Sequence, residues 1–119
     1  MSKYSKVKGS QWESNLEDYW NTEGFKARRL PRAGSKDIGD VAIDLGDKAI
    51  VVEAKNVASA WSQMLKFLRE ANTEAENYAD KYGVDAFPVV ATKTRQHGTG
   101  EGRIIMTIDQ FNELLRALS

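Results

Sequence analysis

Residues 39–55 read GDVAIDLGDKAIVVEAK, and this stretch decides the fold. Two largely apolar runs flank Gly46-Asp47, a dipeptide that favours a two-residue turn between antiparallel strands. With that turn, opposed residues in the hairpin have numbers that add up to 93, so Asp40 lies opposite Glu53. Because side chains alternate between the two faces of a strand, both carboxylates and Lys55 are expected on one face.

The opposed carboxylates indicate a bound cation. Opposed residues have Cβ atoms about 4.5–5.5 Å apart, and like charges at that spacing destabilise a sheet. Lys55 supplies part of the compensating charge, and a divalent metal would supply the rest, since Mg²⁺ binds through one or two carboxylates together with water and phosphate oxygens. The backbone carbonyl of Ala54 is an additional candidate ligand. This arrangement is typical of nucleases, in which a metal polarises the phosphate and a lysine stabilises the developing charge.

A surface ion pair is the ordinary explanation for a glutamate and a lysine two residues apart on a strand. The carboxylate of Asp40 across from Glu53 favours metal binding over that explanation. The interpretation depends on the turn, because a bulge or a longer loop would shift the register. With a shifted register, Asp37 or Asp44 would take the place of Asp40.

The remaining sequence predicts alternating helices and strands. A capping box at residues 10–13 and apolar residues at helical spacing predict a first helix over 10–22, and a long periodic stretch predicts a second over 59–82. Strands are expected at 25–30, 39–45, 48–55, 86–93 and 103–108, and a closing helix at 109–118. The order α-β-β-β-α-β-β-α predicts an α/β fold with a central mixed β-sheet flanked by helices. No repeat or linker interrupts it, so residues 1–119 are expected to form a single domain.

Aromatic and aliphatic residues mark the faces expected to be buried. The predicted face of the second helix contains Trp61, Met64, Leu65, Leu68, Ala71, Ala75, Tyr78, Ala79 and Tyr82. The three tryptophans, Trp12, Trp20 and Trp61, are therefore expected in the core or in a dimer interface.

The composition excludes several classes of protein. The 119 residues include no cysteine and one histidine, which excludes a disulfide scaffold and zinc sites built on thiolates or on several histidines. No apolar stretch approaches the roughly 20 residues of a membrane span, and the N-terminus lacks the apolar core of a signal peptide, so a cytoplasmic location is expected. The 17 basic and 17 acidic side chains balance, which argues against binding nucleic acid over one broad basic surface.

Local basic residues nevertheless surround the hairpin. The first 36 residues carry eight basic and four acidic side chains, and most of the basic ones directly precede the candidate metal site, where phosphates need positive contacts. A solvated loop is the alternative explanation. A glycine-containing loop after residue 93 is expected to reach a second strand of nucleic acid. The candidate DNA contacts are Arg28, Arg29, Arg32, Ser35, Lys36, Lys93 and Arg95.

These residues resemble the PD-(D/E)XK nuclease superfamily, whose signature is an acidic residue on one strand of a hairpin and Glu-x-Lys on the next. Asp40 and Glu53-Ala54-Lys55 match that signature. Within the superfamily, the chain is most similar to archaeal-type Holliday junction resolvases and their small phage and bacterial relatives. Those begin with a helix carrying Gly-Ser-x-x-Glu, which is present here as GSQWE at residues 9–13.

The resemblance implies a restriction-endonuclease-like core and a metal-dependent DNA endonuclease that resolves four-way junctions. It implies that Asp40 and Glu53 bind Mg²⁺, with Mn²⁺ as a substitute, and that Lys55 is the catalytic lysine. It also implies a homodimer with one active site on each of two opposed strands, acting in a bacterial or phage-infected cell. Glu13 would be a further catalytic acid and metal ligand, whereas the sequence without the resemblance favours a capping-box bond from Glu13 to the backbone of Ser10.

The chain departs from the family pattern at two points, of which the balanced charge leaves other DNA substrates open. Gly39 stands where proline commonly precedes the acidic residue, and the balanced charge differs from the basic surface that junction binding favours. The first alternative is a nuclease of the same fold that acts on other branched, flapped, nicked or linear DNA. The second is a non-catalytic DNA-binding protein on a nuclease scaffold.

Overall fold

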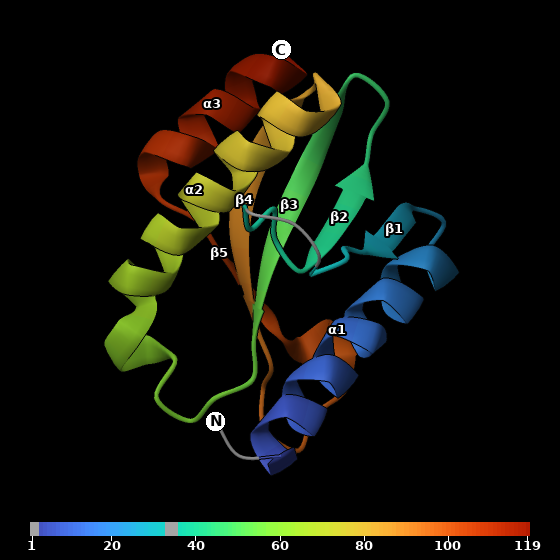
Figure 1. The fold of residues 1–119 in the computed structure, drawn as a ribbon, viewed down its shortest axis with the longest axis vertical. Helices are drawn as coiled ribbons and strands as arrows, with labels where there is room; N and C mark the ends of the chain where they lie inside the picture. The colour runs from blue at the N-terminus through green and yellow to red at the C-terminus, as the bar shows by residue number, and fades with distance from the viewer. Residues whose placement is uncertain (1–2, 33–35) are drawn as a thin grey trace.

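The computed structural model describes residues 3–32 and 36–119, which form a mixed β-sheet with helices on both faces (Figure 1). Three helices and five strands alternate in the predicted order. The elements are α1 (Lys3–Thr22), β1 (Lys26–Arg29), β2 (Val41–Asp44), β3 (Lys48–Lys55), α2 (Met64–Tyr82), β4 (Asp85–Thr92), β5 (Arg103–Ile105) and α3 (Ile108–Leu118). Short 3-10 helices, η1 (Trp61–Gln63) and η2 (Thr99–Glu101), precede α2 and β5. The predicted α/β class is confirmed.

The sheet has the strand order β1-β2-β3-β4-β5. Strands β1, β2 and β3 form an antiparallel meander, β3 and β4 are parallel, and β4 and β5 are antiparallel. A parallel pair needs a long crossover between its strands, and α2 provides it between β3 and β4. The two long central strands are thereby fixed beside each other along eight residues.

The hairpin between β2 and β3 has the predicted register. Val41 pairs with Val52, and Asp44 pairs with Ala49. The turn is closed by a 2.9 Å hydrogen bond from the Leu45 N–H to the carbonyl of Lys48. The register therefore places residues 40 and 53 opposite each other at the open end of the hairpin, beyond the last pair of β2.

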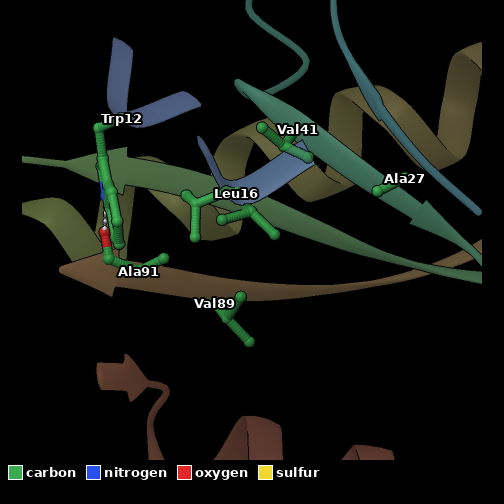
Figure 2. Packing of buried hydrophobic residues seen from close by; sticks show 7 residues of the cluster. Trp12, Leu16, Ala27, Val41, Val89 and Ala91 are labelled. Atoms are coloured by element: carbon green, nitrogen blue, oxygen red, sulfur yellow. Dashed lines mark hydrogen bonds between the residues drawn. The ribbon is translucent and has the colours of Figure 1, made fainter. Parts of the chain in front are cut away.

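One face of the sheet packs against α1. Trp12 and Leu16 of this helix are buried against strand residues, including Val41 and Val89 (Figure 2). The indole N–H of Trp12 donates a 3.1 Å hydrogen bond to the carbonyl of Ala91, so the polar atom of this large side chain is satisfied inside the core. The core prediction for Trp12 is confirmed.

The other face is covered by α2, with α3 beside it (Figure 1). Phe67, Ala71, Ala75 and Tyr78 of α2 are buried against the sheet. A 3.0 Å hydrogen bond from the side chain of Gln110 in α3 to that of Asn72 joins the two helices. No helix within the described ranges is long and apolar enough to cross a membrane.

Two predictions about helices are wrong in detail. Helix α1 begins at Lys3, so Ser10 lies inside the helix and does not cap it. In the second helical region, Trp61 and Leu65 are 58% and 61% exposed. Trp61 belongs to the 3-10 turn at Trp61–Gln63, which has a different rise and twist from an α-helix. Leu65 lies in α2, outside the face that buries Phe67, Ala71 and Ala75.

Candidate active site

Asp40 and Glu53 lie at the open end of the hairpin and are each 6% exposed. The backbone before Asp40 is held by Gly39, which has φ +103° and lies so close to the sheet that a Cβ atom there would be 2.6 Å from a methyl group of Val51. Only glycine adopts this conformation in this space without strain. Gly39 thus lets the chain turn into β2 with the Asp40 carboxylate directed to the end of β3.

The Asp40 carboxylate takes the place of a missing strand partner. Strand β2 begins at Val41, so the edge of β3 beyond Glu53 has no residue of β2 beside it. The N–H of Ala54 instead donates a 2.9 Å hydrogen bond to Oδ2 of Asp40. Because the N–H and C=O of one strand residue lie on the same edge, the carbonyl of Ala54 is on the edge that faces Asp40.

Lys55 follows on the same face as Glu53 and is covered by α2. Its ammonium group lies 4.3 Å from the ring centroid of Phe67 and 3.9 Å from a carboxylate oxygen of Glu70. The lysine is therefore held by helix α2 beside the carboxylate pair.

An arginine connects Glu13 of α1 to the site. Nη2 of Arg32 lies 2.5 Å from Oε2 of Glu13 and 3.0 Å from Oδ1 of Asp40, and it bridges the two carboxylates. Arg29 approaches the other Glu13 oxygen at 3.4 Å. Glu13 is 4% exposed, and its pKa is raised first by burial and then by the charge of Asp40. Because Ser10 lies inside α1, Glu13 does not form the predicted capping box, and Arg32 joins it to Asp40 instead.

Glu74 also lies at the site, although it was not predicted from the sequence. This residue of α2 is 4% exposed and lies within the buried face of the helix, between Ala71 and Ala75. Its neighbours are the carboxyl groups of Glu53 and Asp37. A signal was present in the sequence, because a glutamate inside an apolar helical face contradicts the amphipathic pattern.

Burial raises the pKa values of the clustered carboxyl groups. The pKa of Asp40 is raised to about 8, chiefly by burial and then by its hydrogen bond and charge interaction with Glu53. The pKa of Glu53 is raised to about 7, again chiefly by burial. Arg32 offsets part of the charge on Asp40, but no lysine or arginine of the described residues forms an ion pair with Glu53 or Glu74. The cluster therefore has fewer cationic ion-pair partners than carboxyl groups.

The candidate DNA contacts divide into residues that touch the cluster and residues that do not. Arg29 and Arg32 reach Glu13, and the backbone N–H of Lys93 donates to the carbonyl of Lys55 at 3.3 Å. Arg28 points to α2 instead, where it donates a 2.9 Å hydrogen bond to the hydroxyl of Tyr78.

The other expected contacts lie further out or cannot be placed. Lys36 and Arg95 are exposed, and Ser35 lies outside the described residues. The exposed His97 pairs with Glu101 in its own loop. Asp44, an alternative to Asp40, lies at the opposite end of the hairpin, and Asp37 reaches Glu74.

The donor set fits a cation that keeps much of its hydration. Within residues 3–32 and 36–119, no three carboxylate or histidine side chains converge as a ready-made metal-binding group. Mg²⁺ does not require one, because it usually binds through one or two carboxylates and completes its shell with water and phosphate oxygens. Two buried, opposed carboxylates that lack a full set of cationic partners meet that requirement.

This hairpin, with Glu-x-Lys on a central strand and an opposed aspartate, together with the α/β fold, defines a nuclease of the PD-(D/E)XK class. The sequence profile of the family described as archaeal Holliday junction resolvase (Hjc) matches residues 4–114. The chain belongs to this family of nucleases, and it is an enzyme that resolves Holliday junctions.

A solved structure has the same fold. The chain is similar to the Holliday junction resolvase Hjc of Archaeoglobus fulgidus, an archaeal hyperthermophile, with 21% sequence identity and a TM-score of 0.53. The match covers 82% of this chain and 75% of the Archaeoglobus chain. Among curated protein sequences, none matches.

Proposed function

We propose that this chain hydrolyses phosphodiester bonds at four-way DNA junctions with a divalent cation bound at Asp40 and Glu53. The observation that carries the proposal is the burial of these two carboxylates opposite each other at the end of the hairpin. Two like charges in that position destabilise the fold unless a proton or a cation lies between them, and a cation beside basic residues is suited to phosphate chemistry.

The proposed ligands are one oxygen from each carboxylate and the backbone carbonyl of Ala54, with Mg²⁺ as the cation and Mn²⁺ as a substitute. Glu13 is a further candidate, either as a ligand or through Arg32. When bound, such a cation supplies Lewis acidity toward the phosphate and lowers the pKa of a bound water. The hydrogen bond from the Ala54 N–H fixes Oδ2 of Asp40, so the protein orients this carboxylate before DNA arrives.

Lys55 is proposed to stabilise the negative charge that develops on the phosphate or to orient the attacking water. Its ammonium group is held between Phe67 and Glu70, and it shares the face of Glu53. A cation that is already positioned and partly shielded from water stabilises a transition state more strongly than a mobile one.

Basic residues around the site are proposed to bind the DNA backbone. Arg32 is 70% exposed although it bridges Glu13 and Asp40, so it is accessible to phosphates. Arg29 and Lys36 lie near Arg32 in the chain, and Lys93 lies beside Lys55. Arg28, Ser35 and Arg95 complete the proposed set. These contacts position the backbone and do not read base sequence.

A homodimer is proposed because α3 exposes an apolar stripe. Ile108, Phe111, Leu115 and Leu118 are 80%, 47%, 46% and 66% exposed and recur at helical spacing. A second copy of the chain would cover this stripe and supply a second active site for the opposed DNA strand. Light scattering should give a dimer for the wild type and for Asn112→Glu, and a monomer for Phe111→Glu. A monomeric wild type would contradict paired incision.

We propose that residues 1–119 form a single nuclease domain, because one sheet accommodates every described strand. We further propose that it acts in the cytoplasm of a bacterial or phage-infected cell, where the DNA junctions that it resolves would arise.

Cleavage of a labelled synthetic four-way junction tests the proposal. Linear duplex, flap and single-stranded DNA serve as comparisons, with Mg²⁺ or EDTA, using the wild type and Glu53→Ala. We expect symmetric nicking of the junction that requires Mg²⁺ and is abolished by the substitution. Cleavage of the other substrates as well would favour a nuclease of the same fold with broader specificity. Tight DNA binding without any cleavage would favour a non-catalytic DNA-binding protein.

A further inference from the structure

The buried face of α2 contains one carboxylate whose burial the packing does not explain. Glu74 is 4% exposed and is flanked by the fully buried Ala71 and Ala75. Its Oε1 atom is inaccessible to solvent and has no hydrogen-bond donor among the described residues. Burying a carboxylate without a partner is costly, and such atoms are rare in folded proteins. A ligand that supplies the missing donor would account for it.

The surroundings of Glu74 identify the charge of that ligand. The groups beside it are the carboxyls of Glu53 and Asp37, and the charge of Asp40 also acts on it. The nearby cationic side chains are engaged elsewhere: Arg32 bridges Glu13 and Asp40, and Lys55 lies 3.9 Å from Glu70. Four carboxyl groups therefore follow one another from the strand end to α2, and the ligand that suits them is a hydrated cation.

We infer that Glu74 is a third carboxylate of the cation centre and that it acts through water bound to the cation. The inference rests on the proposed site at Asp40 and Glu53. Direct ligation by all three carboxylates does not fit, because no three such groups in the described ranges converge on one point. Mg²⁺ and Mn²⁺ retain water ligands, and the unpartnered Oε1 of Glu74 is an acceptor for one of them. Glu74 is thus a positioning residue for the hydration shell.

Binding of Mn²⁺ to the DNA-free protein tests this role without using activity. The free Mn²⁺ concentration is followed by its electron paramagnetic resonance signal during titration of the wild type, Glu74→Gln and Glu76→Gln. Glu76 is the matched control, since it is an exposed glutamate two residues further along the same helix. We expect Glu74→Gln to weaken Mn²⁺ binding about 10-fold or more, the range found for groups that orient metal ligands. Glu76→Gln should bind Mn²⁺ like the wild type.

Two further variants distinguish a structural role from the proposed one. Glu74→Asp keeps the charge and should retain more Mn²⁺ affinity than Glu74→Gln, whereas a purely structural role would favour the isosteric glutamine. Thermal unfolding in EDTA checks that each variant folds, and Glu74→Gln should be at least as stable as the wild type because it removes a buried carboxyl group whose Oε1 has no donor among the described residues.

The outcomes separate this inference from the proposed function. If Glu74→Gln binds Mn²⁺ with wild-type affinity while Glu53→Gln loses binding, the role of Glu74 is refuted and the cation site stands. If Glu53→Gln also binds Mn²⁺ like the wild type, the proposed cation site itself is refuted. If Glu74→Asp binds more weakly than Glu74→Gln, the packing of the side chain, not its charge, governs the affinity, and the inference fails.

Discussion

The two aspartates of the hairpin, Asp40 and Asp44, are four residues apart and therefore on the same face of the strand, but they lie at opposite ends of the hairpin. Asp44 is exposed, lies opposite Ala49, and accepts a 2.9 Å hydrogen bond from the N–H of Gly46 in the turn. Asp40 is buried, and it lies opposite Glu53. The same side chain therefore stabilises a turn in water and creates an electrostatic conflict inside the fold. Position relative to neighbouring charges, not residue type, makes one of them a candidate ligand.

The sharpest test of this comparison is to remove one charge at each end. Asp40→Asn should lower the rate of junction cleavage by ~1,000-fold or more, equivalent to about 4 kcal/mol, because a metal ligand supports several kcal/mol of transition-state stabilisation. Asp44→Asn should cleave at the wild-type rate. Single-turnover kinetics in Mg²⁺ measure both. Equal losses in the two variants would mean that the ends of the hairpin do not differ in function.

A glycine at each end extends the comparison to backbone conformation. Gly39 and Gly46 both have positive φ, +103° and +91°, but only Gly39 lies against another residue, Val51. Gly39→Ala should lower the free energy of unfolding by about 1–3 kcal/mol through strain alone, with the clash adding to it. Gly46→Ala should cost about 1 kcal/mol. Chemical denaturation measures the difference, and a larger loss at Gly46 would contradict the close approach at Gly39.

Stability should depend on pH because of the buried end of the hairpin. Burial raises the folded-state pKa of Asp40 to about 8 and that of Glu53 to about 7, above their ordinary values of 3.8 and 4.5. The folded state then holds more protons than the unfolded state between those limits, so the free energy of unfolding falls as pH rises through that window. In EDTA, Tm should decrease from pH 5 to pH 9, and Glu53→Gln should reduce the decrease. A Tm independent of pH would argue against charge conflict at the site.

Mg²⁺ should act against that decrease, since it binds the ionised carboxylates of the folded protein. The increase in Tm caused by Mg²⁺ should therefore be larger at pH 8 than at pH 6. Asp44→Asn, at the other end of the hairpin, should show the same increase as the wild type. An increase that is equal at both pH values would mean that the cation does not compete with protons at this site.

The smallest effect is expected at the turn itself. Asp47 is fully exposed, and the ammonium of Lys48 lowers its pKa through a 2.7 Å ion pair. Exposed pairs of this kind contribute little to stability. Asp47→Asn should leave both Tm and cleavage unchanged within error. A clear loss of stability would show that the turn, as well as the buried end, depends on charge.

The hairpin could be predicted from sequence because its information is local. The dipeptide Gly46-Asp47 sets the turn, and the alternation of side chains then fixes which residues oppose each other. Strand β3 was predicted with its observed bounds, Lys48–Lys55, and the pairing of Val41 with Val52 confirms the register. The opposed positions of Asp40 and Glu53 follow directly from this register.

The contributions from helices could not be predicted in the same way, because they depend on long-range packing. The residues around Ser10 are compatible with both a helix cap and a helix interior, and only the start of α1 at Lys3 distinguishes these two positions. Glu74 was missed because only apolar residues were assigned to the buried face of the second helix, whereas the structure buries this glutamate beside Ala71 and Ala75. The bridge from Arg32 to Glu13 joins residues 19 apart in the chain, and no spacing rule anticipates it.

The hydrogen bond between the Ala54 N–H and Asp40 gives the site a natural reporter. Other amides of β3 are protected from solvent exchange by neighbouring strands, whereas this one is protected by a side chain at the end of the sheet. The exchange rate of the Ala54 amide therefore reports whether its hydrogen bond to Asp40 is formed. Its nitrogen and proton chemical shifts report whether the Asp40 carboxylate also binds a cation. A single backbone signal in an NMR spectrum can thus follow occupancy of the active site while the rest of the sheet stays unchanged.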